Sequence, residues 1–205
     1  MRSISSVLSV CVLTGFMMSA QQHRLAGASV KTGDPSCGLV YGKDHMLLVC
    51  APEGWVLDNK MLAGQGIYAA FYRRNLPSEK AQSQSTLMYV DVQSKSAGRW
   101  NAEQMMTLDA EKTRRDSPKL EVRKTAPILI PADKAKNRKA RVVPVQTFLN
   151  DYGGGYEATA YVEEEHTITL LVISSVSEAL LQRDYPSFVK LVKSYSFVGS
   201  DGHMQ

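Results

Sequence analysis

The sequence has little of the material from which metal and catalytic sites are built. It contains four histidines and three cysteines in 205 residues. No HExxH motif, no histidine pair at helical spacing and no cysteine cluster occurs, so a dedicated zinc or copper site is not indicated. A Gly-x-Ser-x-Gly nucleophile elbow is also missing. The sequence therefore predicts no catalytic residue, no metal ligand and no cofactor, and it favours a non-enzymatic protein, with an enzyme as the alternative.

Charge and hydropathy are equally modest. The net charge is +4 with an isoelectric point near 8.9, and the basic residues are dispersed, so no nucleic-acid partner is predicted. Hydrophobic residues make up 44% and charged residues 21% of the chain, which excludes disorder throughout. A mean hydropathy of -0.20 excludes a protein with many membrane spans. What is left is an ordinary globular chain of one-domain length.

The first twenty residues have the pattern of a secretory signal peptide. Met1-Arg2-Ser3 is a short positive start, and the stretch from Ile4 to Ala20 is uncharged and mostly apolar. We expect cleavage after Ala20, with Ala26-Gly27-Ala28 as the alternative site. A lipoprotein box ending at Cys11 and an uncleaved anchor are the competing interpretations. The prediction is an exported protein, periplasmic or secreted.

Removal of residues 1–20 leaves two cysteines, Cys37 and Cys50, and an even count in an oxidising compartment predicts a disulfide. Two apolar runs between them flank the polar loop 42–45, which is typical of a β-hairpin. A register that pairs Tyr41 with Met46 also places Cys37 opposite Cys50. Both faces of this hairpin are apolar, so we expect it inside a covered sheet. The alternative, a redox or metal pair, lacks CxxC spacing.

Two helices are expected. The first begins after Asn101, whose side chain forms an approximate capping box with Gln104, and it stops before Pro118. The second begins near Ser177 and has the strongest periodic signal of the chain, with an apolar face of Leu181, Tyr185, Phe188, Val192 and Tyr195. Pro186 interrupts it, so we expect a kink or two abutting helices, the second opening near Asp184.

The remaining segments predict strands. Pro127 and Pro131 bracket an Ile-Leu-Ile segment, which is at best an edge strand. In the last hairpin we expect Val162 to face Thr167. The fold class is α+β, one mainly antiparallel sheet flanked by helices. We expect a flexible leader at 21–36, a single domain at 37–198 and a disordered tail at 199–205. The expected strands are 55–57, 67–72, 85–92, 120–123, 140–149, 156–162 and 167–173.

Two charged segments are candidate contact sites. A basic run places five cations in eight positions, and its plain interpretation is a solvated loop that discourages edge-to-edge pairing. The alternative is contact with anionic head groups or an acidic protein surface. The loop Glu163–His166 is interpreted as a solvated hairpin loop, with weak cation binding as the alternative. The five basic residues are Lys134, Lys136, Arg138, Lys139 and Arg141.

Short motifs carry a family resemblance. An opening strand, the turn Ala51-Pro52-Glu53-Gly54-Trp55, a central helix and a closing helix followed by Ser194-Tyr195-Ser196-Phe197 resemble the PsbP-like superfamily (PsbP/DcrB-like exported bacterial proteins). The resemblance covers roughly residues 38–198. It implies an α/β/α sandwich around a mainly antiparallel sheet and accessory, assembly or chaperone-like binding to a larger partner. No site residue of that group is carried over.

Two classes of function follow from these patterns. The first is a small exported binding or accessory module of the cell envelope, whose partner is another envelope protein, with weak contact to the membrane surface as an addition. The second is an envelope enzyme or small-solute binder. An immunity- or inhibitor-type partner protein is a further alternative. An exposed apolar patch favours the first class, and a deep pocket with convergent polar groups favours the second.

Overall fold

A computed structural model describes residues 36–42, 45–67, 69–76, 86–95, 101–133, 138–151 and 155–199. The predicted signal peptide, the leader up to residue 35, the tail beyond Gly199, and Lys134 and Lys136 lie outside these residues. Over the described ranges, no helix combines the length and the apolar character that a membrane crossing requires.

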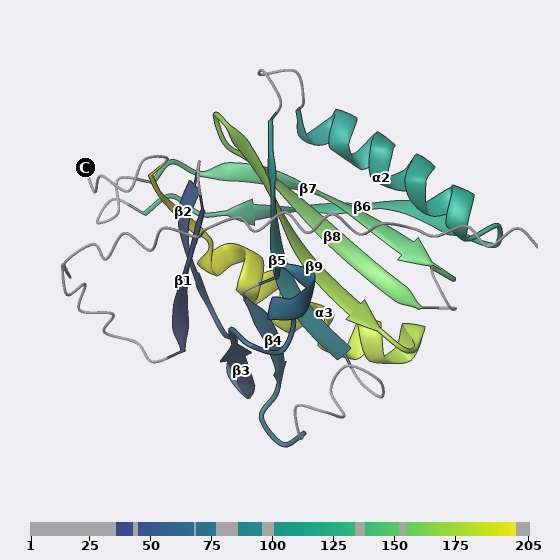
Figure 1. Cartoon of the computed structure of the whole chain (residues 1–205), viewed down its shortest axis with the longest axis horizontal. Helices are drawn as coiled ribbons and strands as arrows, with labels where there is room; N and C mark the ends of the chain where they lie inside the picture. The colour runs from purple at the N-terminus through teal and green to yellow at the C-terminus, as the bar shows by residue number, and fades with distance from the viewer. Residues whose placement is uncertain are drawn as a thin grey trace, which may run out of the picture. The chain divides into compact units, whose positions relative to one another are not determined.

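The described residues form two sheets. The larger has seven strands, and every neighbouring pair is antiparallel (Figure 1). Its order is β3-β4-β5-β9-β8-β7-β6. The centre depends on the nine-residue pairing of β5 with β9, which joins segments far apart in the sequence. The strands are β3 (Trp55–Asp58), β4 (Ala70–Arg73), β5 (Thr86–Ser94), β6 (Glu121–Ile130), β7 (Arg141–Leu149), β8 (Tyr156–Glu163) and β9 (Thr167–Ser175), and a short 3-10 helix, η1 (Ala63–Gln65), precedes β4.

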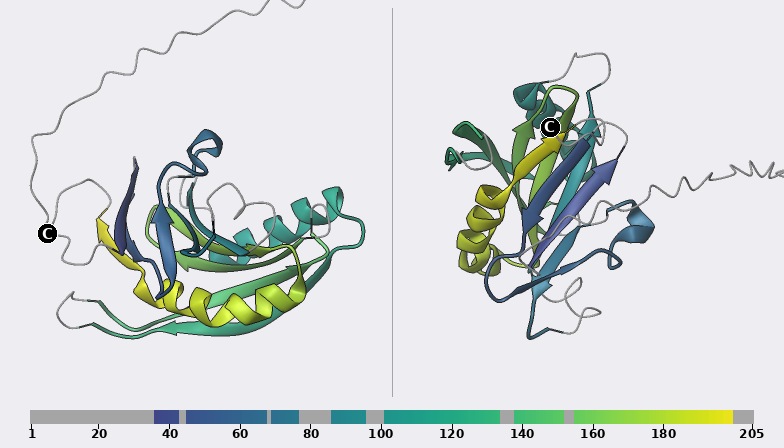
Figure 2. Two further views of the ribbon diagram at one scale, coloured as in Figure 1. Left: turned by 90° about the horizontal axis from the view of Figure 1, so that it is seen from below. Right: turned by 90° about the vertical axis from the view of Figure 1, so that its left-hand side faces the viewer.

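The two helices cover opposite faces of this sheet. Leu171 and Ile173 of β9 share a core cluster with α3 (Glu178–Ser194), whereas Leu170 and Val172 pack in the cluster of α2 (Ala102–Asp116). Alternate residues of a strand point to opposite faces, so the sheet lies between the helices, as the left view of Figure 2 shows. The predicted α+β class, a mainly antiparallel sheet flanked by helices, is confirmed.

A second sheet holds the disulfide hairpin. β1 (Cys37–Gly42), β2 (His45–Cys50) and β10 (Ser196–Gly199) form three antiparallel strands in the order β1-β2-β10. The predicted register is confirmed, because Tyr41 pairs with Met46 and Cys37 with Cys50, whose sulfur atoms are 2.05 Å apart. The prediction of one sheet is wrong, because the hairpin pairs with the end of the chain instead of with the central strands.

The expectation that both faces of the hairpin are covered is also wrong. Leu47 and Val49 are fully buried against the main core, whereas Leu39 is 43% and Tyr41 78% exposed. The small sheet packs one face against the core that contains α3 and leaves part of the other face to solvent.

Local helix signals are confirmed. Asn101 and Gln104 form the predicted capping box of α2, and Ser177 caps α3. The apolar face of α3 is buried as expected, but α3 is one continuous helix, so the prediction of two abutting helices is wrong. Pro186 lies on the exposed side of α3, where water can bond the carbonyl that lacks its helical partner.

Strand ends differ from the predictions. β4 starts at Ala70 rather than at residue 67, and the two segments expected around Pro127 are one strand, β6, with a register shift between Thr125 and Ile128. The edge position is confirmed. Val162 pairs with Thr169 instead of Thr167. A two-residue slip leaves every side chain on the same face, so the apolar pattern does not distinguish the two registers.

Candidate functional site

The described part of the basic run surrounds a hollow of about 430 Å³, but its arginines are engaged internally. Arg138 donates to the Tyr195 carbonyl at 2.6 Å, and Arg141 pairs with the carboxylate of Glu164. Lys139 is exposed. Two of these three cations therefore hold the end of the chain against the sheet, which leaves less positive charge for an anionic partner than the pattern suggests.

The acidic loop between β8 and β9 is occupied in the same way. Glu163 accepts from Lys95 at 2.7 Å and from the backbone N–H of Ala102, at the positive end of the α2 dipole. Glu164 accepts from Arg141 and from the buried Tyr195 hydroxyl at 2.9 Å. Throughout the described ranges no three histidine, cysteine or carboxylate side chains are grouped as metal ligands. The carboxylates of this loop fasten α2 and the C-terminal segment.

A groove of about 480 Å³ runs between α2 and the strands β6 and β7. It exists because α2 buries only its narrow face of Ala102, Met106 and Ala110, while the sheet extends beyond the width of one helix. The walls are mainly apolar, formed by Met106 and Ala110 of α2 and by Pro127, Pro144 and Val145 of the strands. Its size lies within the range of small-molecule sites.

Polar groups gather at one end of this groove. α2 leads into β6 through a short turn, so Arg114 near the end of the helix and Lys124 near the start of the strand lie at the same end. Both are exposed, and neither has an ion-pair partner among the described residues. Gln146 is the cross-strand neighbour of Lys124. Glu111, one helical turn before Arg114, also lines the groove and reduces the positive charge there.

Gln146 is the most informative residue of the groove. Its side chain is only 6% exposed, and its amide oxygen Oε1 has no hydrogen-bond partner among the described residues. A buried acceptor without a donor costs about 1–3 kcal/mol. Gln146 is not among the residues predicted from the sequence, although the two adjacent polar residues Gln146 and Thr147 within the apolar run from Val142 to Leu149 were an available signal.

A second hollow of about 280 Å³, the acidic hollow, lies on the other flank of α2. Burial, and then the nearby charge of Asp151, raise the pKa of Glu157 to about 7. Burial also raises the pKa of Asp109, whose carboxylate accepts from the Tyr161 hydroxyl at 2.9 Å. Lys112 contributes one positive charge. The titratable groups that line the hollow are Tyr89 and Asp91 of β5, Asp109, Lys112 and Asp116 of α2, Asp151, and Glu157 of β8.

A buried ion pair lies on the opposite side of the sheet. Asp184 of α3 is fully buried and accepts from Arg73 and, at 2.8 Å, from Arg183. Arg73 in turn lies over the Trp55 ring, 5.2 Å from its centroid. Burial alone would raise the pKa of Asp184, but hydrogen bonds from Arg183, Arg73 and Thr86 outweigh it and hold the pKa at about 2. At neutral pH this carboxylate is therefore ionised and paired, which indicates a structural role.

No protein-family model and no curated protein matches the chain. In structure, the chain is similar to cyanobacterial PsbP (CyanoP) from Synechocystis, with 11% sequence identity and a TM-score of 0.45 over 83% of this chain and 98% of that one. At this identity and TM-score the likeness carries no argument about a ligand, a partner or a function.

Proposed function

We propose that the protein is an exported, non-enzymatic binding module of the cell envelope that holds an amphiphilic ligand in the groove beneath α2. The observation that carries the proposal is the groove itself, with apolar walls and a buried, unpaired amide oxygen at one end. The disulfide between Cys37 and Cys50 is compatible with an oxidising compartment.

The chemistry of the groove defines the class of ligand. Met106, Ala110 and the two prolines provide an apolar surface for a hydrocarbon chain. Arg114 and Lys124 attract a carboxylate, and Gln146 Oε1 needs a donor such as an amide N–H. A ligand that meets all three requirements is an apolar chain ending in an amide and a carboxylate, as in an N-acyl amino acid.

The test uses three probes that differ by one group each, titrated into the full chain by isothermal calorimetry below their micelle concentrations. N-dodecanoylglycine carries chain, amide and carboxylate, its methyl ester lacks the charge, and dodecanoate lacks the amide. We expect N-dodecanoylglycine to bind at least about tenfold more tightly than either analogue, because each missing contact is worth about 1.4 kcal/mol or more.

Matched variants locate the site. Ala110→Trp fills the groove and should abolish binding, and Arg114→Ala should weaken binding of the acid but not of the ester. Arg115→Ala is the control, because Arg115 is an exposed neighbour on α2 that does not line the groove. Gln146→Leu should weaken the binding of N-dodecanoylglycine to the affinity that wild type has for dodecanoate. Equal binding by wild type and Ala110→Trp, or no binding of any probe to wild type, would contradict the proposal.

A further inference from the structure

The described strands form two sheets with four edges, and three of these edges carry features that oppose pairing with another strand. β6 has a register shift beside Pro127, β10 is irregular between Phe197 and Gly199, and β3 is only four residues long and ends in Asp58. β6 also exposes charged side chains within its first four residues. Natural sheets use such features to keep their edges from joining other chains. The exposed charges of β6 are Glu121, Arg123 and Lys124.

The fourth edge, β1, has none of these features. Its six residues, Cys-Gly-Leu-Val-Tyr-Gly, contain no charge and no proline, and they pair with β2 in an unbroken register. Leu39 and Tyr41 are among the large apolar side chains that the described residues expose. An uncharged edge with an unbroken register is a template for another strand.

The backbone groups of β1 that point away from β2 follow from the ladder. The N–H of Ala51 donates to the carbonyl of Ser36 at 2.8 Å, so this pair is hydrogen-bonded. Hydrogen-bonded and non-bonded pairs alternate, which places the N–H and C=O of Cys37, Leu39 and Tyr41 on the outer edge. In the described part of the chain, these three residues have no other hydrogen-bond partner.

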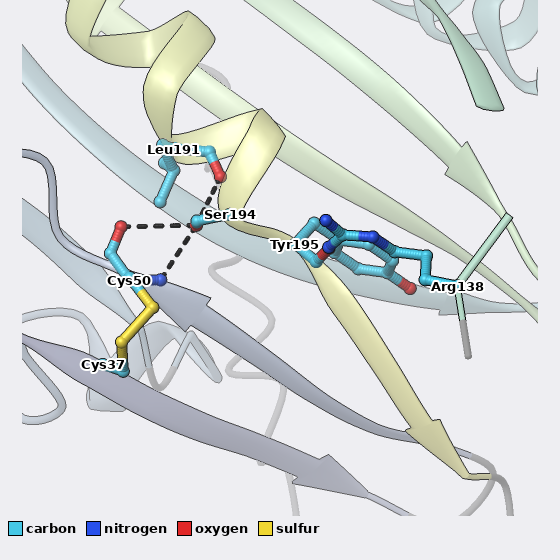
Figure 3. Close-up of a disulfide and its surroundings, with 6 residues drawn as sticks. All are labelled: Cys37, Cys50, Arg138, Leu191, Ser194 and Tyr195. Atoms are coloured by element: carbon cyan, nitrogen blue, oxygen red, sulfur yellow. Dashed lines mark hydrogen bonds between the residues drawn. A yellow bond between two sulfur atoms is a disulfide. The ribbon is translucent and has the colours of Figure 1, made fainter. Parts of the chain in front are cut away.

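The hairpin is held rigidly in place. The disulfide ties the start of β1 to β2, and Ser194 at the end of α3 accepts from the Cys50 N–H at 2.9 Å and donates to the Leu191 carbonyl at 2.6 Å (Figure 3). An edge that is already ordered loses little conformational entropy when another strand binds to it.

We infer that β1 pairs with β1 of a second copy of this chain, antiparallel about a two-fold axis at Leu39. In this register Leu39 faces Leu39 of the second copy, and Cys37 faces its Tyr41. All of these residues direct their backbone groups outward, so the two strands exchange roughly six main-chain hydrogen bonds. No charged side chain of either strand opposes another, and the same patch serves both copies, as a two-fold interface requires.

The side chains beside the edge fit this arrangement. A hollow of about 320 Å³ adjoins β1 and is lined by residues of β1 together with Leu57, Asn59 and Ala69, with no residue of β2. Val40 of the second copy lies opposite Gly38 and has the length to enter this hollow. The aromatic ring of Tyr41 covers the disulfide of the other copy, a favourable contact between sulfur and an aromatic ring.

The test is analytical ultracentrifugation of the disulfide-intact chain from about 1 to about 200 µM. We expect a reversible dimer whose dissociation constant rises at least about a hundredfold in Leu39→Lys, because two lysines would then face each other. Val142→Lys is the control, since Val142 is 67% exposed on β7 of the other sheet, and it should dimerise as wild type does. Circular dichroism checks that each variant is folded, and Tyr41→Lys is the replacement should Leu39→Lys not fold.

Hydrogen exchange reports the occupant of the edge. We expect the amides of Leu39 and Tyr41 to exchange more slowly as the protein concentration rises. A monomer at every concentration, or a dimer unaffected by Leu39→Lys, would overturn the inference. Slow exchange that does not depend on concentration would also overturn it, because the edge would then be covered by another segment of the same chain. None of these results depends on whether the groove beneath α2 binds N-dodecanoylglycine.

Discussion

At the scale of single residues, two buried polar side chains differ in how they are satisfied. Asp184 accepts hydrogen bonds from two arginines, so its burial is compensated within the protein. The amide oxygen of Gln146 has no such compensation among the described residues. A compensated group stabilises the fold, whereas an uncompensated one at the wall of a groove is available to a ligand. This contrast is why the candidate site is built on Gln146 rather than on the stronger charges of Asp184.

Replacement of Asp184 should destabilise the protein and change its response to acid. We expect Asp184→Asn to cost about 2–4 kcal/mol at pH 7, because a buried pair is broken while both arginines can still reach water. The pKa of about 2 lies below the ordinary aspartate value, so this contribution is complete above about pH 4 and is lost as the pH falls towards 2. Urea unfolding at pH 7 and pH 3 measures both effects.

The control for this prediction is Glu178→Gln on the same helix, whose carboxylate lies 3.8 Å from the exposed Arg123. An exposed pair of this kind is screened by solvent and contributes little, so the variant should unfold nearly as wild type does. A loss of stability in Asp184→Asn that is as large at pH 3 as at pH 7 would show that packing, not the charge, is responsible.

Glu157 is expected to produce the opposite pH dependence. Burial and then Asp151 raise its pKa to about 7, so the folded state holds a proton that the unfolded chain releases near pH 4.5. The folded state therefore loses stability as the pH rises from about 4.5 to 7. We expect the stability of Glu157→Gln relative to that of wild type to be higher at pH 8 than at pH 5. Urea unfolding of both proteins at the two pH values measures this difference.

Glu53→Gln serves as the exposed control, and it should change the stability similarly at both pH values. If Glu157→Gln lowers the stability equally at pH 5 and pH 8, the Glu157 carboxylate is charged in the folded state at both pH values. Other groups around the acidic hollow would then compensate that charge.

At the scale of single elements, local signals were sufficient wherever neighbouring residues decide the conformation. The capping box at Asn101, the start of α3 after Ser177 and the register of the β1–β2 hairpin are confirmed. Each depends on hydrogen bonds or side-chain pairs between residues close in sequence. The start of β4 was predicted three residues too early. The register of β8 with β9 was predicted wrongly because the two registers present the same apolar faces.

The disulfide hairpin permits a prediction at this scale. The loop closed by Cys37 and Cys50 has a sequence separation of 13, for which the chain-entropy estimate is about 3 kcal/mol. We expect the double variant Cys37→Ser/Cys50→Ser to lose about this much in urea unfolding. Reductant should lower the stability of wild type to that of the double variant and leave the double variant unchanged. Equal stability of both proteins without reductant would contradict the prediction.

At the scale of the whole molecule, the candidate site is a consequence of how layers meet. The single helix α2 is narrower than the seven-stranded sheet on which it lies, so a hollow is left on each of its two flanks. Gln146 of β7 and Arg114 of α2 are 32 positions apart in number and share the groove only because β6 returns beneath the helix. No pattern of spacing within the sequence identifies such a site. Of the basic run that spacing did identify, two of the three described cations, Arg138 and Arg141, are engaged in internal contacts.

The sequence by itself determined the features that short-range physical chemistry controls: the helix caps and apolar faces, the disulfide register, the edge position of β6 and the α+β class. Tertiary structure alone decided that the hairpin pairs with β10, that Asp184 is neutralised by Arg73, and that a groove lies beneath α2. These outcomes depend on contacts between residues far apart in the chain. The packing of the whole core decides which distant segment pairs with a given strand edge and which distant residue pairs with a buried charge.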